Sequence, residues 1–225
     1  LPAVNLPCLE SVDGFVKIMS NPALTSIELP KLTDVGELVD IRRNNALARM
    51  NMESLTTVSD SLLIYQNHAL TAIDLSALTT VDNYLSINDN DGVTRIDMSS
   101  LTSIGDQESP LARIMDLDID SNPELINVHL PSLTSVAGDL IIRRNDSLTT
   151  LAIPSLEYVG FRVRISNNPA LTDVTVPDLT PPYTACGETF EVEASGSGFQ
   201  NYSQGCVRIP LGPGGVPWGL GGSCE

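Results

Sequence analysis

Residues 140–160 read LIIRRNDSLTTLAIPSLEYVG, and this spacing of apolar residues around an asparagine returns along most of the chain. In every unit an isoleucine stands three residues before the asparagine and a leucine eleven residues after it. The interval between asparagines is constant except for one longer step from Asn90, and the series is Asn21, Asn44, Asn67, Asn90, Asn122, Asn145 and Asn168. Self-similarity at a period of this length indicates a fold built from stacked repeats.

The spacing inside one unit predicts strands. Apolar and polar residues alternate in short runs, which is typical of β-structure. Helical spacing is never kept over ten residues, and a proline recurs at one point in four units, as Pro30, Pro131, Pro154 and Pro177. We expect each unit to form one coil of short strands joined by tight corners. The chain is therefore predicted to be all-β, a right-handed parallel β-solenoid of 23-residue coils.

The recurrent asparagine is expected to be structural. A corner of the coil turns backbone N–H and C=O groups inward, where they need hydrogen-bond partners. A short amide side chain bonds such groups, tolerates unusual backbone angles and stacks on its equivalents in neighbouring coils. The alternative is an exposed row of asparagines that binds a ligand.

The repeat frame resembles the receptor L domain, a leucine-rich repeat family found as a pair in the insulin and epidermal growth factor receptor families. It is more similar still to fungal cell-wall GPI-anchored proteins and bacterial surface proteins with the same repeats. The motif that carries the resemblance is L-x-I-x-x-N-x-x-L followed by L-x-x-L-x-x-V, and it covers residues 1 to about 180. The resemblance implies an extracellular module that binds protein or contributes to a cell wall, and that is not an enzyme.

The composition changes at Pro181. We divide the chain into a solenoid of about seven and a half coils, residues 1–180, and a Gly/Pro-rich C-terminal tail, residues 181–225. Ten of the sixteen glycines lie between Gly187 and Gly222. Trp218 is the single tryptophan, and we expect it to anchor the tail, either on its own rod or on a neighbouring molecule.

Four cysteines predict two disulfides. They are Cys8, Cys186, Cys206 and Cys224, which allow three pairings. We expect Cys186 to pair with Cys206 across a local loop, which leaves Cys224 for Cys8 of the same chain or of a neighbour. Because disulfides persist in oxidising compartments, an extracellular or cell-surface location is favoured over a cytosolic protein with four unpaired thiols.

The net charge excludes several classes of partner. With 28 acidic against 12 basic side chains, the formal charge is −16. Nucleic acid requires a basic surface, and an anionic membrane repels such a chain. No run of about 18 apolar residues is present, so we expect no direct insertion into a membrane. The partners that remain are protein or glycan, including copies of this chain.

Acidic residues concentrate at one strand. Asp116, Asp118 and Asp120 alternate in MDLDIDSN, residues 115–122, so their side chains are expected to share one outer face. Ser86, Asn88 and Asp89 stand at matching positions one coil earlier, and together these oxygens predict a calcium site, the one cofactor expected. Two alternatives stay open: charge pairing with Arg143 one coil later, and acid–base chemistry on a polysaccharide.

Two pairs of arginines occupy matching places in different coils, Arg42 with Arg43 and Arg143 with Arg144. They predict two basic spots that meet a partner, or arginines that are solvated along the face. The longer step after Asn90 contains a nine-residue insertion, residues 105–113. Insertions in solenoids loop out on one face and often carry binding.

The sequence thus favours a non-enzymatic extracellular or cell-surface protein, a structural or recognition module that binds protein or glycan. The first alternative is a self-assembling filament or surface-layer subunit that is linked end to end through its tail. A carbohydrate-active enzyme is a further alternative, and it depends on the Asp116, Asp118 and Asp120 cluster alone.

Overall fold

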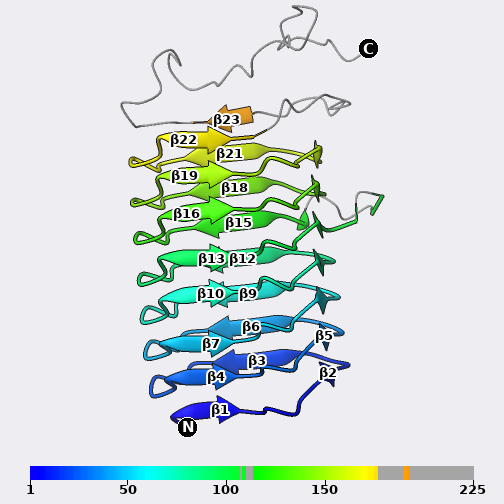
Figure 1. Ribbon diagram of the computed structural model, residues 1–225, viewed down its shortest axis with the longest axis vertical. Coiled ribbons are helices and arrows are strands. Elements are labelled where there is room, and N and C mark those ends of the chain that lie inside the picture. Colours follow the sequence, from blue (N-terminus) through cyan, green and yellow to red (C-terminus); the bar gives the residue numbers. More distant parts are fainter. Residues whose placement is uncertain (107, 110–113, 177–189, 193–225) are drawn as a thin grey trace, which may run out of the picture.

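The structure is a computed structural model that describes residues 1–106, 108–109, 114–176 and 190–192. Over these residues the chain is all-β and winds into a solenoid of about 7 coils, with equivalent positions about 23 residues apart (Figure 1). The β-solenoid predicted from the repeat is therefore confirmed. A typical coil contributes three short strands, and parallel pairing of equivalent strands builds three faces along the rod.

Two faces are each a single parallel sheet. The first is eight-stranded and consists of β3 (Val16–Met19), β6 (Val39–Arg42), β9 (Leu62–Tyr65), β12 (Leu85–Asn88), β15 (Leu117–Asp120), β18 (Leu140–Arg143), β21 (Val163–Ser166) and β23 (Phe190–Val192). The second is seven-stranded and consists of β2 (Ser11–Val12), β5 (Asp34–Val35), β8 (Thr57–Val58), β11 (Thr80–Val81), β14 (Ser103–Ile104), β17 (Ser135–Val136) and β20 (Tyr158–Val159).

The third face is divided into two parallel sheets. The first three coils form a three-stranded sheet of β1 (Ala3–Asn5), β4 (Ser26–Glu28) and β7 (Arg49–Asn51). The later coils form a five-stranded sheet of β10 (Ala72–Asp74), β13 (Arg95–Asp97), β16 (Asn127–His129), β19 (Thr150–Ala152) and β22 (Asp173–Thr175).

Equivalent residues of successive coils pair in register. Val39 pairs with Leu62, and Leu62 pairs with Leu85, at the constant step of the repeat. The step is longer between Leu85 and Leu117, yet these two residues still pair. The insertion between β14 and β15 therefore does not shift the register of the coils that follow.

The repeated apolar residues fill the interior. The isoleucines before the asparagines, from Ile41 to Ile165, are at most 1% exposed, and so are the leucines that follow, from Leu32 to Leu156. Burying one such side chain contributes about 1.5–3 kcal/mol, so the stacked dry layers supply most of the stabilisation. Thin layers of medium-sized aliphatic residues leave little room for rings, which accounts for an aromatic content of only 4%.

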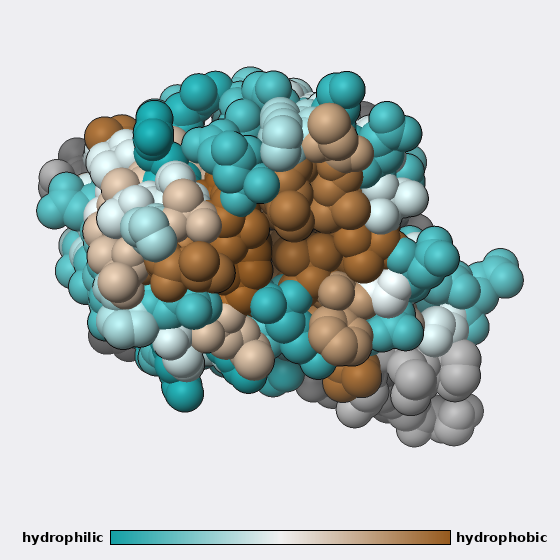
Figure 2. Space-filling model, turned by 90° about the horizontal axis from the view of Figure 1, so that it is seen from below, coloured by the Kyte–Doolittle hydropathy of each residue, from teal (hydrophilic) through white to brown (hydrophobic). Residues whose placement is uncertain are grey.

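The two ends of the rod differ. At the upper end in Figure 1, β23 adds to β21, so three residues of the segment assigned to the tail extend the eight-stranded sheet. At the lower end, the first coil presents a continuous apolar surface within a polar rim (Figure 2). Leu1, Leu6, Phe15 and Met19 are exposed in the first coil. Among the described residues, no helix has the length and apolar character needed to cross a membrane.

Candidate functional site

The corner after each strand of the eight-stranded sheet holds the recurrent asparagine. From Asn44 to Asn168 these side chains are at most 1% exposed. Asn67 is representative: its Nδ2 donates to the carbonyl of Ile41 at 2.9 Å and to Oδ1 of Asn90 at 3.3 Å. Its Oδ1 accepts the backbone N–H of Asn44 at 3.2 Å. The asparagines thus form a buried column that joins each coil to both neighbours, the structural role expected from their spacing.

The unusual backbone angles lie one residue earlier than the sequence suggested. In the described part of the chain, positive φ at a non-glycine residue occurs only directly before a column asparagine, at Ser20, Arg43, Gln66, Asp89, Ser121, Arg144 and Asn167. The values lie between 53° and 58°, in the left-handed region. This residue turns the chain, and the asparagine that follows needs no strained angle to point inward.

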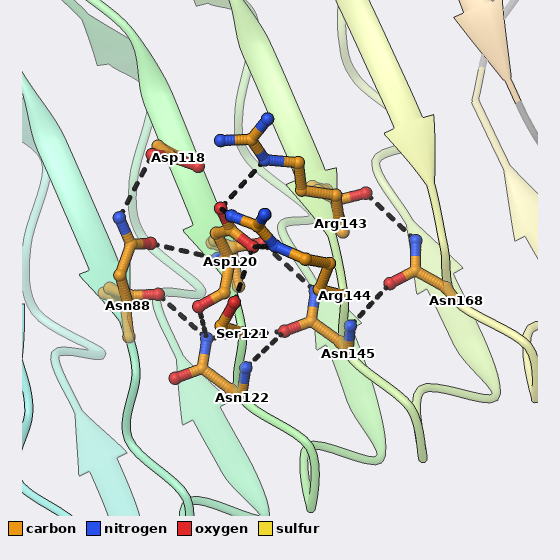
Figure 3. Close-up of polar contacts among 12 residues, drawn as sticks. Asn88, Asp118, Asp120, Ser121, Asn122, Arg143, Arg144, Asn145 and Asn168 are labelled. Atoms are coloured by element: carbon orange, nitrogen blue, oxygen red, sulfur yellow. Dashed lines mark hydrogen bonds and ion pairs between the residues drawn. The ribbon is translucent and has the colours of Figure 1, made fainter.

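Polar and charged side chains gather on the outer face of β12, β15, β18 and β21, where Arg143 and Arg144 converge on Asp120 (Figure 3). Asp120 is 4% exposed, and its carboxylate accepts the Nε–H groups of both arginines at 2.8 Å. Burial opposes ionisation, but hydrogen bonds from Arg144, Ser121 and Arg143 hold the pKa of Asp120 below its usual value. The pairing with Arg143, left open by the sequence, is present and is joined by Arg144.

Asp118 lies beside this cluster but takes no part in it. Its side chain is 7% exposed, and Oδ2 accepts the Tyr84 hydroxyl at 2.9 Å and the Asn88 amide at 3.1 Å. Oδ1 is buried and has no hydrogen-bond partner. Burial raises the pKa of Asp118, and burial together with the Asp118 charge raises the pKa of Tyr84. Asp118 is therefore a buried carboxyl group with half of its acceptor capacity unused.

Asp116 stands directly before β15, two residues before Asp118 and on the same face of the sheet. Its Oδ1 accepts the backbone N–H of Asp139 at 2.7 Å. Burial, helped by the charges of Asp139 and Asp118, raises the pKa of Asp116 to about 6. Asp139 is 5% exposed and binds Nε of Arg162 at 3.0 Å. The pair of Asp116 and Asp118 is thus flanked by carboxylates that have arginine partners.

The other predicted arginine pair has different surroundings. Nε of Arg42 lies 3.4 Å from Oδ2 of Asp40, and its guanidinium contacts the hydroxyl of Tyr65 and lies 5.4 Å from the centre of that ring. Arg43 donates to Gln66 at 3.0 Å on the exposed surface. Both arginine pairs are engaged along the rod, and their contact with a partner stays a prediction.

The four residues proposed for calcium do not form one metal-binding group. Among the described residues, no group of three or more acidic, histidine or cysteine side chains is placed to hold a metal ion. Asp120 is occupied by arginine, and Asp89 lies in the corner of the previous coil. Within the described part of the chain, no arginine or lysine lies at ion-pair distance from Asp116 or Asp118, and Arg162 and Arg143 act on them only from farther away. Calcium binding stays a prediction.

The insertion leaves the rod beside Asp116. Gly105 has φ +73°, and a Cβ on it would lie 2.5 Å from Cβ of Met115 and 2.9 Å from Cβ of Ala137, so only glycine fits. Met115 and Ala137 are buried and pack with Phe161 at this corner. The described start of the loop, Gly105 and Asp106, is therefore packed against Met115, the residue before Asp116.

Several predicted site residues cannot be placed. Cys186, Cys206, Cys224 and Trp218 lie outside the described residues. Cys8 is exposed on the first coil. The two disulfides and the anchoring of the tail therefore stay predictions.

Three residues of the site were not singled out from the sequence: Tyr84, Asp139 and Arg162. A usable signal existed, because Tyr84, Asp116, Asp139 and Arg162 fall at one position of successive coils. Aligning the coils, insertion included, would have placed these side chains in one column along the outer face.

Comparison with protein-family models, with curated proteins and with solved structures finds no match for this chain. The resemblance to L domains therefore rests on the sequence motif. Function has to be argued from the fold and from the outer face of the eight-stranded sheet.

Proposed function

We propose that this chain is a non-enzymatic recognition or structural module of an extracellular or cell-surface protein, and that it binds protein or glycan through the outer face of its eight-stranded sheet. The observation that carries the proposal is the array of polar and charged side chains on and directly beside β12, β15, β18 and β21. These side chains come from four consecutive coils, and hydrogen bonds between the coils fix them in place.

Three features support this face as the binding surface. A solenoid presents long continuous faces whose backbone is rigid, so side chains on them are preorganised for a partner. Gly105, the first residue of the insertion, lies against Met115, which directly precedes Asp116, and insertions in solenoids often contribute to binding. The L-domain motif agrees with a surface module that binds protein or glycan.

Screening the immobilised chain against a glycan array and a displayed random-peptide library tests the proposal. Ile141 lies at the centre of the face on β18 and is half-buried, whereas Asn127 is exposed on β16 of another face. We expect Ile141→Glu to weaken the best ligand about tenfold, a change of about 1.4 kcal/mol. The matched variant Asn127→Glu should bind as wild type. A ligand that is lost only in Asn127→Glu would move the site to another face.

The same screen addresses the enzyme alternative. A carboxyl group whose pKa is raised to about 6, next to a second carboxyl group, is also the arrangement that acid–base catalysis on sugars uses. We expect no new reducing ends when polysaccharides from the array are incubated with the chain. Cleavage that disappears in both Asp116→Asn and Asp118→Asn would overturn the non-enzymatic part of the proposal.

The apolar end of the first coil favours a second candidate, end-to-end self-association as a filament or surface-layer subunit. Leu6 is 49% exposed in the first coil, whereas Ile126 is 44% exposed beside β16. Sedimentation velocity should show multimers of wild type that grow with concentration, and Leu6→Glu should shift them to monomer. The matched variant Ile126→Glu should assemble as wild type. A monomer at every concentration, with and without reductant, would remove this candidate.

A further inference from the structure

We propose that the pair of Asp116 and Asp118 is the contact point for an arginine side chain that a protein partner supplies. The inference rests on the proposed function and narrows it, because it names the chemistry of the partner: a protein with an accessible arginine. The site is the outer face of β15 between Tyr84 on one side and Asp139 on the other.

The carboxylates on this face differ in whether an arginine contacts them. Buried carboxylates there are paired with arginines: Asp40 with Arg42, Asp120 with Arg143 and Arg144, and Asp139 with Arg162. Among the described residues, no arginine or lysine forms an ion pair with Asp116 or Asp118. These two acids therefore lack the direct arginine contact that the other three have, although burial raises their pKa values against the opposing charges of Arg162 on Asp116 and Arg143 on Asp118.

Asp118 has one carboxyl oxygen that accepts no hydrogen bond. Its Oδ1 is buried without a partner, and leaving a buried acceptor unsatisfied is costly. Tyr84 and Asn88 fix the carboxyl group through Oδ2, which leaves Oδ1 as the oxygen that a ligand has to satisfy. A carboxylate oxygen accepts hydrogen bonds, so the group that Oδ1 of Asp118 lacks is a hydrogen-bond donor.

A guanidinium group fits this pair of carboxyl groups better than a calcium ion does. Calcium requires six to eight oxygen ligands, and no suitable group of three metal-binding side chains exists among the described residues. Side chains on alternate residues of a strand stand about 6–7 Å apart, and a guanidinium carries five donors in a planar fork that spans neighbouring acceptors. A chain of net charge −16 also attracts basic partners and repels acidic ones.

The test is a titration of the full chain with N-acetyl-arginine methylamide, followed by amide chemical shifts in two-dimensional NMR. The neutral isostere N-acetyl-citrulline methylamide and calcium chloride are titrated in parallel. We expect saturable shifts around residues 116–118 with an affinity near 1 mM, which corresponds to about 4 kcal/mol. Asp118→Asn should abolish these shifts, and Asp74→Asn, which removes an exposed acid on β10, should leave them unchanged. The NMR spectrum of each variant shows whether the fold is intact.

Four results would overturn the inference. Equal binding of the citrulline compound would show that charge is not recognised, and saturation by calcium at these residues without binding of the arginine compound would identify a metal site. Arg113 is the last residue of the insertion, and it is the nearest cationic residue along the sequence. Binding of the arginine compound to Arg113→Ala but not to wild type would show that Arg113 of the same chain supplies the cation. Absence of shifts with every probe would remove the site while leaving the proposed function intact, because the glycan and peptide screens test that function independently.

Discussion

The column of asparagines and the acidic face of β15 are built on the same coils, yet they satisfy polar groups in opposite ways. In the column, identical amides repeat in every coil, and each one inside the rod is bonded to the coil before it and the coil after it. On the face, the residue type changes from coil to coil, and Asp118 keeps a buried oxygen without a partner. The asparagines that repeat in every coil stabilise the fold, whereas the candidate site lies where the residue type changes from coil to coil.

Removing one amide from the middle of the column should produce the largest effect. Asn122→Ala deletes donors to the carbonyls of Ile87 and Asp120 and leaves the buried N–H of Asn90 unpaired. Each such loss costs about 1–3 kcal/mol, so we expect the free energy of unfolding to fall by about 4 kcal/mol. Chemical denaturation measures it, with exposed Asn127→Ala as the control. A loss below about 1 kcal/mol would show that the column is not a main support of the fold.

Removing both arginines from Asp120 should rank second. Arg143→Ala with Arg144→Ala leaves a carboxylate that is 4% exposed without cations, and we expect a loss of about 3 kcal/mol at neutral pH. Because these bonds lower the pKa of Asp120, the stability they confer is present above its ordinary pKa of 3.8 and is lost as the pH falls. The gap between wild type and variant should therefore narrow in acid. Adding Asp120→Asn should recover part of the loss; no recovery would contradict this origin.

Neutralising Asp116 should have the opposite sign. A folded-state pKa raised to about 6 means that the folded chain binds the proton more tightly than the unfolded chain does, so wild type loses stability as the pH rises from about 4 through 6. With allowance for solvent screening of this half-buried group, Asp116→Asn should stabilise by about 1 kcal/mol at pH 7.5 and by almost nothing at pH 4. Melting temperatures across that range, beside Asp74→Asn, measure it. Destabilisation of Asp116→Asn at pH 7.5 would refute the assignment.

The smallest change is expected at Arg43, which occupies the same corner position as Arg144. Its donation to Gln66 lies on the exposed surface, so Arg43→Ala should cost about 0.3 kcal/mol. The single variant Arg144→Ala, measured in the same denaturation series, should cost clearly more because Arg144 binds buried Asp120. Equal losses in the free energy of unfolding would mean that an arginine at this corner stabilises the fold by the same amount whether or not it binds a buried acid.

The solenoid and its buried asparagines were predictable because their signals are local and repeated. A coil of constant length returns every apolar residue to the same depth, so the printed sequence already states which side chains are interior. The burial of Asp118 and Asp120 was not predictable in this way, since alternation assigned both to an outer face. Their cover comes from side chains of neighbouring coils, including Tyr84 and Arg144, and depends on contacts between residues that are far apart in the sequence.

The left-handed corner was misplaced for a related reason. Asparagine tolerates positive φ, so the sequence predicts that conformation at the recurrent residue. The structure gives that conformation to the preceding residue, whose identity varies, and conformation at this point is imposed by the stacking of coils and not by local preference. A signal that differs in every repeat cannot be recognised as part of the repeat.

That variable row, from Ser20 to Asn167, has a consequence for how such a chain diversifies. The same backbone step carries serine, arginine, glutamine, aspartate and asparagine in turn, at intervals of about 4.8 Å along the rod. The backbone turn accepts each of these residue types, so a position whose side chain makes no buried contact can change without disturbing the coil; Arg144, which binds buried Asp120, is an exception. A chain of this kind can evolve a new surface one coil at a time while its interior remains the same.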